Sequence, residues 1–489
     1  MTYDYDLIVI GGGAAGLTAS GMGATFGAKT LMIERARLGG DCTWTGCVPS
    51  KTLLKSAGIA HHLRNAGRFG LSDAPVRVDF ARVMTHLRAV RQAVYEEADA
   101  PEIYEKMGVE VRTGAARFLD AHTVEIARDG GSDRATGRFF VIAAGASAFV
   151  PPIDGLKETP HLTNETLFEL DALPGRLAVV GGGPIGTEMA QAFARLGSEV
   201  TVIDMLPRLL ARDDEELAAL LRETLEAEGV RCVLGAGVKR IVREGGEVVI
   251  TVEREGARRE VRADAVLMAT GRRANVDGLG LEAAGVAFTR HGVTVNDRCR
   301  TNHRHIYAVG DVTGRYQFTH MSEHMARVAV TNALLKIPMK IDTKHVPWVT
   351  YTDPELAHVG ATEAALAGRG TPFEVFRFPF SKIDRAVTDG ETTGWIKVFA
   401  KKNGRILGAS ILGASAGEMI GELALAMRNG VTLRQIADTI HPYPTYGLGV
   451  RRAADQWYVR RQSPTLVRIL QKLFRYRGPV LEFGPDQIV

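Results

Sequence analysis

Two of the chain's four cysteines lie close together in the stretch GGDCTWTGCVPSK (residues 39–51), which ends in a lysine. Three kinds of chemistry suit Cys42 and Cys47 at this spacing: a structural disulfide, half of a metal site, or a redox-active pair. A zinc site needs about four ligands, and the chain has no second cysteine pair to supply them. We therefore expect no metal site here, while an inert disulfide and a redox pair both stay open.

A glycine-rich turn precedes the cysteines and is the first element that could place a cofactor beside them. The sequence YDLIVIGGGAAGLTAS predicts a buried strand, a turn with the spacing G-x-G-x-x-G, and a helix. The residues of the turn and of the helix start are Gly11, Gly13, Ala14, Ala15 and Gly16. Free N–H groups at the helix start favour a pyrophosphate. Glu34 ends the next strand, 21 residues after Gly13, where it would accept a hydrogen bond from a ribose hydroxyl.

The same pattern recurs in RLAVVGGGPIGTEMAQAFARLGSEVTVID, which ends at Asp204. Its turn and the following helix contain Gly181, Gly183, Ile185, Gly186 and Glu188. Two complete fingerprints in one chain imply two dinucleotides, and this pairing is typical of a flavoprotein that also binds a nicotinamide cofactor. We therefore expect FAD at the first turn and a nicotinamide dinucleotide at the second.

Asp204 bears on which nicotinamide cofactor binds. A carboxylate at this position accepts hydrogen bonds from a 2′-hydroxyl group but repels a 2′-phosphate. Arg208 and Arg212 follow, and they would reach a phosphate only if their loop turned back. The sequence thus favours NADH, with NADPH as the alternative.

Composition is that of a soluble globular protein of about three domains, with 489 residues and 24% charged side chains. The four cysteines argue against a secreted disulfide scaffold and for the reducing cytoplasm. The acidic start MTYDYDLIVI has no basic region of the kind that opens a signal peptide. From Arg451 onward, seven arginines and one lysine face three acids, a net charge of +5, so the remainder carries about −1 of the total of +4. This distribution gives no support for a nucleic-acid-binding protein.

With two fingerprints and the cysteine pair, the sequence resembles the class I flavoprotein disulfide reductases. AAGASAFVPPIDG (143–155) and ATGRRAN (269–275) are similar to the crossings between flavin and nicotinamide domains. IYAVGDVTG (306–314) resembles the second flavin motif, and VPWVTYTDPELAHVG (346–360) resembles the start of a dimerisation domain. The resemblance implies a homodimer with an α/β fold that has two Rossmann-like domains and a C-terminal α+β domain. The implied ranges are 1–153 and 276–343 for the FAD domain, 154–275 for the NAD(P)H domain, 344–462 for the dimerisation domain and 463–489 for a basic amphipathic tail.

The resemblance also implies roles for individual residues. Cys47 would face the flavin as the charge-transfer thiol and Cys42 the substrate as the interchange thiol, which answers the question of the cysteine pair. Lys51 would lie near the flavin ring, paired with Glu188. Further implied cofactor contacts are Gly40, Ala144, Gly145, Gly271, Gly310 and Asp311, with Asp311 at the ribityl chain. His320 would either approach the flavin ring or cap a helix.

The C-terminal motif departs from the family pattern. Relatives that reduce organic disulfides carry H-x-H-P-T-x-x-E, in which the second histidine and the glutamate form an acid–base dyad acting across the dimer. Here the stretch is HPYPTYGLG, so Tyr443 and Leu448 occupy the dyad positions and His441 matches the first, non-catalytic histidine. We expect an acceptor such as a disulfide or a thiol-bound metal. The alternatives are a transhydrogenase or a quinone or metal-ion diaphorase that bypasses the cysteines, and a non-enzymatic scaffold.

The tail SPTLVRILQKLFRYRGPV predicts an amphipathic helix that begins at Pro464. Leu466, Ile469, Leu470 and Leu473 fall on one face, and Arg468, Gln471, Lys472 and Arg475 on the other. The helix would either dock on the dimerisation domain or lie on an anionic membrane surface, which would place the protein at the inner face of a membrane.

Overall fold

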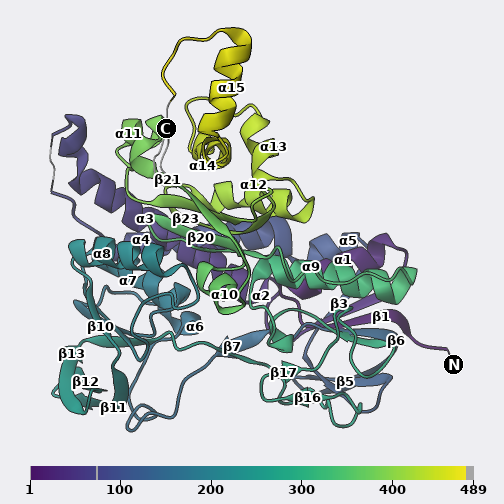
Figure 1. The fold of residues 1–489 in the computed structure, drawn as a ribbon. Helices are drawn as coiled ribbons and strands as arrows, with labels where there is room; N and C mark the ends of the chain where they lie inside the picture. The colour runs from purple at the N-terminus through teal and green to yellow at the C-terminus, as the bar shows by residue number, and fades with distance from the viewer. Residues whose placement is uncertain (1, 73–74, 481–489) are drawn as a thin grey trace. The chain divides into compact units, whose positions relative to one another are not determined.

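The computed structural model describes residues 2–72 and 75–480 (Figure 1). The chain divides into two compact units, one made of Met1–Pro207 with Gly229–Asp342 and the other of Arg208–Glu228 with Thr343–Val489. Residues 481–489 of the predicted tail lie outside the described residues. No helix within the described ranges is long and apolar enough to cross a membrane.

The first unit begins with a parallel sheet in the strand order β3-β2-β1-β6, and β18 pairs with the far side of β6. Strand β1 is buried on both faces over Leu7–Ile10, as this unbroken apolar run requires in a parallel sheet. Helix α1 packs against α9. The bounds are β1 Tyr5–Ile10, α1 Ala14–Thr25, β2 Thr30–Glu34, β3 Val109–Thr113, β6 Gly131–Ile142, β18 Ile306–Ala308 and α9 Thr319–Val330.

A second parallel sheet in the same unit has the order β10-β9-β8-β14, with α7 following β8. Each parallel sheet is accompanied by a three-stranded antiparallel sheet: the first half of β6 continues into β5 and β4, and β11, β12 and β13 form the other. The bounds are β4 Ala115–Phe118, β5 Thr123–Arg128, β8 Arg176–Val180, α7 Pro184–Leu196, β9 Glu199–Asp204, β10 Arg231–Leu234, β11 Gly237–Glu244, β12 Glu247–Arg254, β13 Ala257–Ala263 and β14 Ala265–Met268. The expected α/β class with two dinucleotide folds is thus confirmed, whereas the exact domain boundaries stay predictions.

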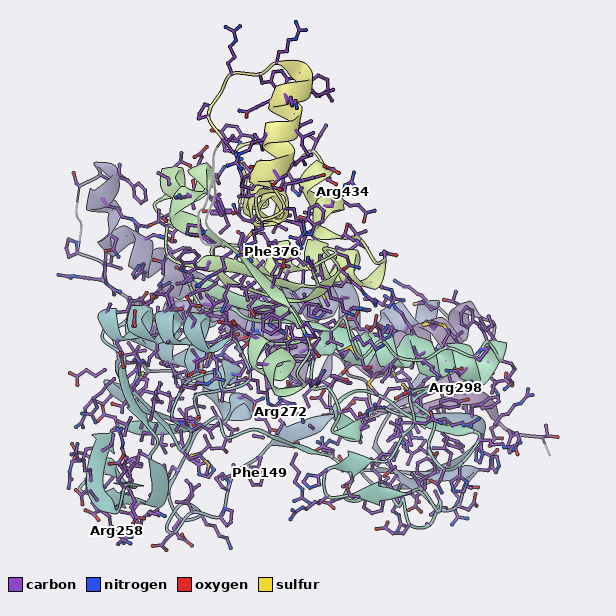
Figure 2. The ribbon with its side chains drawn as sticks, in the orientation of Figure 1. Phe149, Arg258, Arg272, Arg298, Phe376 and Arg434 are labelled. Carbon is purple, nitrogen blue, oxygen red and sulfur yellow. The ribbon has the colours of Figure 1, made fainter. Side chains whose placement is uncertain are left out.

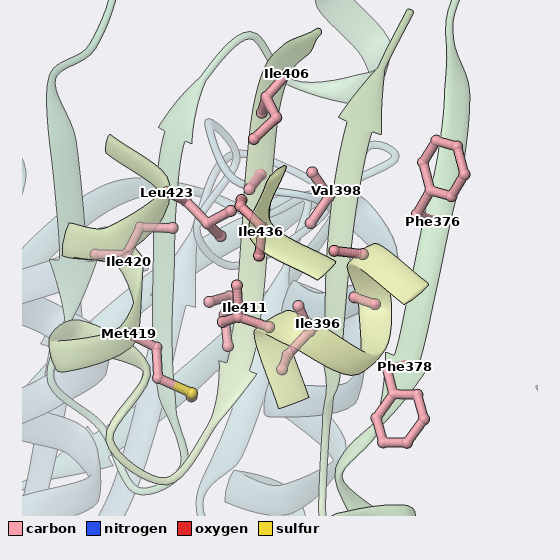
Figure 3. Close-up of a cluster of buried hydrophobic side chains, with 14 of the residues drawn as sticks. Phe376, Phe378, Ile396, Val398, Ile406, Ile411, Met419, Ile420, Leu423 and Ile436 are labelled. Atoms are coloured by element: carbon pink, nitrogen blue, oxygen red, sulfur yellow. The ribbon is translucent and has the colours of Figure 1, made fainter. Parts of the chain in front are cut away.

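The second unit is built on an antiparallel sheet in the order β19-β20-β23-β22-β21. Its core is apolar side chains from the sheet and from helices α12, α13 and α14, including Phe376, Ile411 and Leu423 (Figure 3). The bounds are β19 Pro347–Thr350, β20 Glu355–Gly360, β21 Glu374–Pro379, β22 Trp395–Ala400, β23 Ile406–Gly413, α12 Ala416–Arg428, α13 Leu433–Asp438 and α14 Leu448–Val459.

Helix α8 (Glu215–Ala227) follows β9 in sequence but belongs to the second unit. A buried lysine on β22, Lys397, is only 3% exposed and holds the start of this helix. Its ammonium group lies 2.7 Å from Asp214 and 3.1 Å from Glu216. Glu363 accepts a third hydrogen bond at 3.0 Å. An ammonium group removed from water needs such partners, because a buried unpaired charge is strongly destabilising.

The predicted tail helix is α15, Pro464–Phe474, and it begins where Pro464 indicated. The Ser463 side chain caps it by accepting a hydrogen bond from the Leu466 N–H. None of its residues is buried, so its apolar side chains are not covered by the described part of this chain. The amphipathic helix is confirmed, and its docking site stays a prediction.

Candidate functional site

The first glycine turn joins β1 to α1 through a contact that leaves no room for a side chain. A Cβ atom on Gly16 would lie 1.8 Å from the Gly11 carbonyl oxygen, so the helix start can approach the strand only with glycine here. Gly13 is the N-cap residue of α1, and no side chain caps this helix. The open N–H groups at the helix start are the groups that bind a pyrophosphate in dinucleotide folds.

The second turn repeats this geometry between β8 and α7. A Cβ atom on Gly186 would lie 1.9 Å from the Gly181 carbonyl oxygen. Gly183 is the N-cap residue of α7, again without a side-chain cap, and a Cβ atom there would meet nothing within 4 Å. Each turn therefore offers an uncapped helix start and fits a dinucleotide phosphate.

The two strand-end acids are held in the same way. Glu34 accepts hydrogen bonds from the N–H groups of Gly12 at 2.7 Å and Ala36 at 2.8 Å. Asp204 accepts from Gly182 at 2.5 Å and Leu206 at 2.7 Å. Each carboxylate is thus fixed beside its glycine turn, with lone pairs left to accept from a ribose hydroxyl. Their fit to two nucleotides rests on this matched arrangement.

The two cysteines lie on consecutive helices, Cys42 on α2 (Gly40–Trp44) and Cys47 on α3 (Cys47–Arg64). Cys42 and Cys47 are both free thiols and partly buried. Cys47 is the first residue of α3, and its Sγ lies 3.4 Å from the hydroxyl of Thr319, the first residue of α9. The sulfur of Cys47 is therefore at the start of α3 and contacts the start of α9, where partial positive charge favours a thiolate.

The two thiols differ strongly in acidity. A hydrogen bond from the Cys42 thiol, with Thr319 and the Lys51 charge, lowers the pKa of Cys47 to about 6 against the effect of burial. Donating that hydrogen bond, together with burial, raises the pKa of Cys42 far above its ordinary value. The reduced pair thus carries one negative charge, which is held on Cys47.

Lys51 and Glu188 come together across α3 and α7, which pack against each other. The Lys51 ammonium lies 2.9 Å from a Glu188 carboxylate oxygen, and the glutamate side chain is 6% exposed. The second glycine motif thus supplies the partner of a lysine in the cysteine motif, 137 residues away. Their catalytic roles stay predictions.

Arg272 was not among the predicted site residues, although it lies in the quoted ATGRRAN motif. Its guanidinium is 3.0 Å from Asp41, the neighbour of Cys42, and 3.4 Å from Asp311. Burial raises the pKa of Asp311 to about 6. The atom of Arg272 that faces Asp311 is its buried Nε, which makes this ion pair but no hydrogen bond of good geometry within the described residues. Its N–H group therefore keeps hydrogen-bonding capacity that a polar ligand beside Asp311 could use.

The remaining predicted cofactor residues lie on the turns of the first unit. Gly40, Gly145, Gly271 and Gly310 have positive φ angles. The Ala144 carbonyl accepts from Asn275 at 2.9 Å, and Ile185 is exposed on α7. His320 is exposed and stacks on Phe318, and its expected role at the flavin ring or as a helix cap stays a prediction. Thr319, its neighbour, contacts Cys47.

The C-terminal residues are each engaged within the second unit. The Tyr443 hydroxyl donates to Asp384 at 2.8 Å, and this contact raises the pKa of the tyrosine. His441 has Thr439 oxygen at 3.0 Å from one ring nitrogen and Glu422 at 3.0 Å from the other. Leu448 is buried at the start of α14. Each ring nitrogen of His441 thus lies within hydrogen-bond distance of an oxygen atom.

Comparison with known proteins identifies the family. Residues 5–326 match the pyridine nucleotide-disulphide oxidoreductase family, and residues 346–454 match the dimerisation domain of that family. A mercuric reductase of Lysinibacillus sphaericus is 35% identical over 92% of this chain and 82% of its own length. A dihydrolipoyl dehydrogenase of Thermus scotoductus is 37% identical over 92% of this chain and 97% of its own.

Among solved structures, the Cu(II) complex of the HOCl-induced flavoprotein disulfide reductase RclA from Escherichia coli is similar, with a TM-score of 0.83 and 31% identity. The matched region covers 93% of this chain and 99% of the RclA chain. The chain therefore belongs to the pyridine nucleotide-disulphide oxidoreductases, a family of enzymes that depend on a flavin and a pyridine nucleotide, and its dimerisation domain supports a homodimer.

Proposed function

We propose that this member of the family is a cytoplasmic, NADH-dependent reductase in which electrons pass by way of FAD to the Cys42–Cys47 pair and then to an external acceptor. The observation that carries the proposal is the polarised thiol pair, with its acidic member at the start of α3 and against Thr319. Both dinucleotide turns lie in the same compact unit as this pair. The small number of cysteines favours a reducing compartment.

The cysteine pair and the Lys51–Glu188 pair each have a defined part in this proposal. Bound FAD would supply the two-electron chemistry that links a nicotinamide to the thiols. Cys47 holds the negative charge of the reduced pair, and Lys51, fixed by Glu188, stabilises that charge. Cys42 keeps its proton until it attacks or receives the acceptor, because only one thiol of the pair ionises at neutral pH.

Of the possible acceptors, a thiol-bound metal or a similar group is proposed in preference to an organic disulfide. Disulfide exchange needs a group that moves a proton to and from the interchange thiol. Tyr443, at the position of the dyad histidine, has a raised pKa and is a poor base near neutral pH, and Leu448, at the glutamate position, carries no charge. The mercuric reductase among the relatives supports this choice of acceptor class.

The thiol roles are tested by the long-wavelength absorbance that a thiolate gives beside an oxidised flavin. Cys47→Ser should abolish this band in the two-electron-reduced enzyme, because it removes the thiolate. Cys42→Ser should show the band without reduction, because it leaves Cys47 unpaired. A band that persists in Cys47→Ser would overturn the roles. Acceptor turnover that is unchanged in Cys42→Ser would instead favour the transhydrogenase or diaphorase alternative.

NADH should be preferred over NADPH by at least about tenfold in kcat/KM, a difference on the order of 1.4 kcal/mol. Asp204 is fixed at the end of β9, and Arg208 donates to the carbonyl oxygens of Ala211 and Asp213, so its guanidinium is already engaged. Asp204→Ala should reduce the ratio, and Arg212→Ala, which removes the exposed neighbouring arginine, should leave it unchanged. Equal steady-state use of both cofactors by the unmodified enzyme would refute this assignment.

Dihydrolipoamide and glutathione disulfide should be poor substrates, since acid–base assistance is worth about 10²–10⁴ in rate. Tyr443→His combined with Leu448→Glu should raise lipoamide turnover by more than the two single changes together, because an imidazole needs a carboxylate to orient it. Leu448 is buried, so thermal unfolding of each variant provides the control. Lipoamide turnover by the unmodified enzyme at about ten per second or faster would contradict this expectation.

We also propose that α15 lets the dimer contact an anionic membrane surface. Five apolar side chains on this helix are exposed: Leu466, Ile469, Leu470, Leu473 and Phe474. Basic residues surround them, namely Arg468, Lys472, Arg475 and Arg477. An exposed apolar stripe flanked by cations has the chemistry that interfacial helices use on anionic lipids.

Truncation after Arg461 should reduce sedimentation of the enzyme with vesicles that contain phosphatidylserine, and added salt should weaken binding of the full chain. Replacing Arg468 and Lys472 with glutamine is the matched control for charge alone and should reduce binding partly. Equal sedimentation of truncated and full-length enzyme would exclude the membrane contact and favour docking on the dimer.

A further inference from the structure

Asp41 lies directly before Cys42 in the loop that carries the two cysteines (39–47), and its carboxylate accepts three hydrogen bonds. One of its oxygens accepts from the Thr45 hydroxyl at 2.7 Å and from the Asn164 amide at 2.9 Å. The other oxygen accepts from Arg272 at 3.0 Å. Asn164 also donates to the Thr45 carbonyl at 3.2 Å. Asp41 thus ties the loop internally and attaches it to two distant segments of the same unit.

Arg272 is the most firmly held of these partners. It begins β15 (Arg272–Ala274), which pairs antiparallel with β7 (Ala146–Ala148). Its guanidinium donates to the Ala146 carbonyl at 2.7 Å, faces Asp311 at 3.4 Å, and is 12% exposed (labelled in Figure 2). A planar fork that is anchored by backbone at one end presents its remaining N–H groups in a fixed direction. The Asp41 carboxylate therefore meets a preset donor.

The charges of these groups act on the thiol pair. The negative charge of Asp41 opposes a thiolate and raises the pKa of both Cys42 and Cys47, whereas Lys51 acts in the opposite sense on Cys47. Thr319 also contacts Cys47 and favours the thiolate, while Glu188 pairs with Lys51 and Asp311 faces Arg272. Charges interact strongly where water is largely excluded, so pairing Asp41 with the buried Arg272 cation weakens its effect on the thiols.

We propose that Arg272 and Asp41 form a positioning pair for the redox cysteines: Arg272 fixes the loop that carries Cys42 and screens the negative charge of Asp41 from the thiolate. Neither residue touches the acceptor in this role. The inference deepens the proposed function, because it concerns the same thiol pair and rests on Cys47 carrying the thiolate.

The experiment follows alkylation of Cys47 by iodoacetamide across a pH series, with the modified peptide quantified by mass spectrometry. The holoenzyme carries Cys42→Ser so that one thiol titrates alone. Asp41→Asn should shift the alkylation midpoint to lower pH, because it removes a negative charge and keeps the shape. Arg272→Met should shift it to higher pH, because it exposes the charge of Asp41. Each change should alter the rate below the midpoint by about threefold, equivalent to about half a pH unit.

Three further variants separate positioning from general damage. The double variant Asp41→Asn with Arg272→Met should return towards the midpoint of the background, since the two effects oppose each other. Arg272→Lys should recover part of the shift because it keeps the charge without the fork. Arg273→Met removes the adjacent exposed arginine, which pairs with Asp277 at 2.6 Å, and should leave the midpoint unchanged.

Shifts of the same sign in Asp41→Asn and Arg272→Met, or no shift in Asp41→Asn, would overturn the inference. The proposed function is read separately from the thiolate–flavin band of the same Cys42→Ser background. Opposite shifts in alkylation without any band would sustain the positioning pair and refute the electron route. A thiolate–flavin band together with an unshifted alkylation midpoint would sustain the electron route and refute the positioning pair.

Discussion

One negative charge shared by two thiols is the interaction on which the rest of the first unit depends. A thiolate that is largely removed from water is costly unless positive groups surround it. Here the start of α3 holds Cys47, Thr319 at the start of α9 contacts it, and Lys51 supplies a full charge. These groups come from segments far apart in sequence, and the packing of α3 against α7 and of α9 against α1 holds the helices that carry them.

The sequence was informative where local backbone geometry dictates residue type. A Cβ atom at Gly16 or Gly186 would collide with the carbonyl of Gly11 or Gly181, so the spacing alone predicts both turns and the folds around them. The acids Glu34 and Asp204 are similarly tied to their strands, and the family resemblance placed Lys51 beside Glu188. Local constraints of this kind determine residue type and spacing, so they can be recognised in a single sequence.

The pairings that the sequence did not reveal depend on long-range contacts between ordinary residue types. Thr319 meets Cys47 across 272 positions, and Arg272 meets Asp41 across 231. Nothing in the spacing of a threonine or an arginine distinguishes these from surface residues. Histidine types such as His320 stand out in a sequence because they carry chemistry, whereas the threonine beside it does not. The attachment of α8 to the second unit through buried Lys397 has the same character, since a lysine in a strand predicts exposure.

The matched acids on the two nucleotide folds show how one backbone design can serve two cofactors. Glu34 and Asp204 each accept a hydrogen bond from the N–H of the middle glycine of the turn. Each also accepts one from the N–H of the residue two positions after the acid itself. Because the two acids are held alike, we expect selectivity between the cofactors to arise from the surroundings of each turn. At the first turn Gly40 closes on the Gly13 backbone, where a Cβ on Gly40 would lie 2.7 Å from the Gly13 Cα, whereas a Cβ on Gly183 would meet nothing within 4 Å. A turn covered by the cysteine loop suits a cofactor that stays bound, and an open one suits a cofactor that enters and leaves at each turnover.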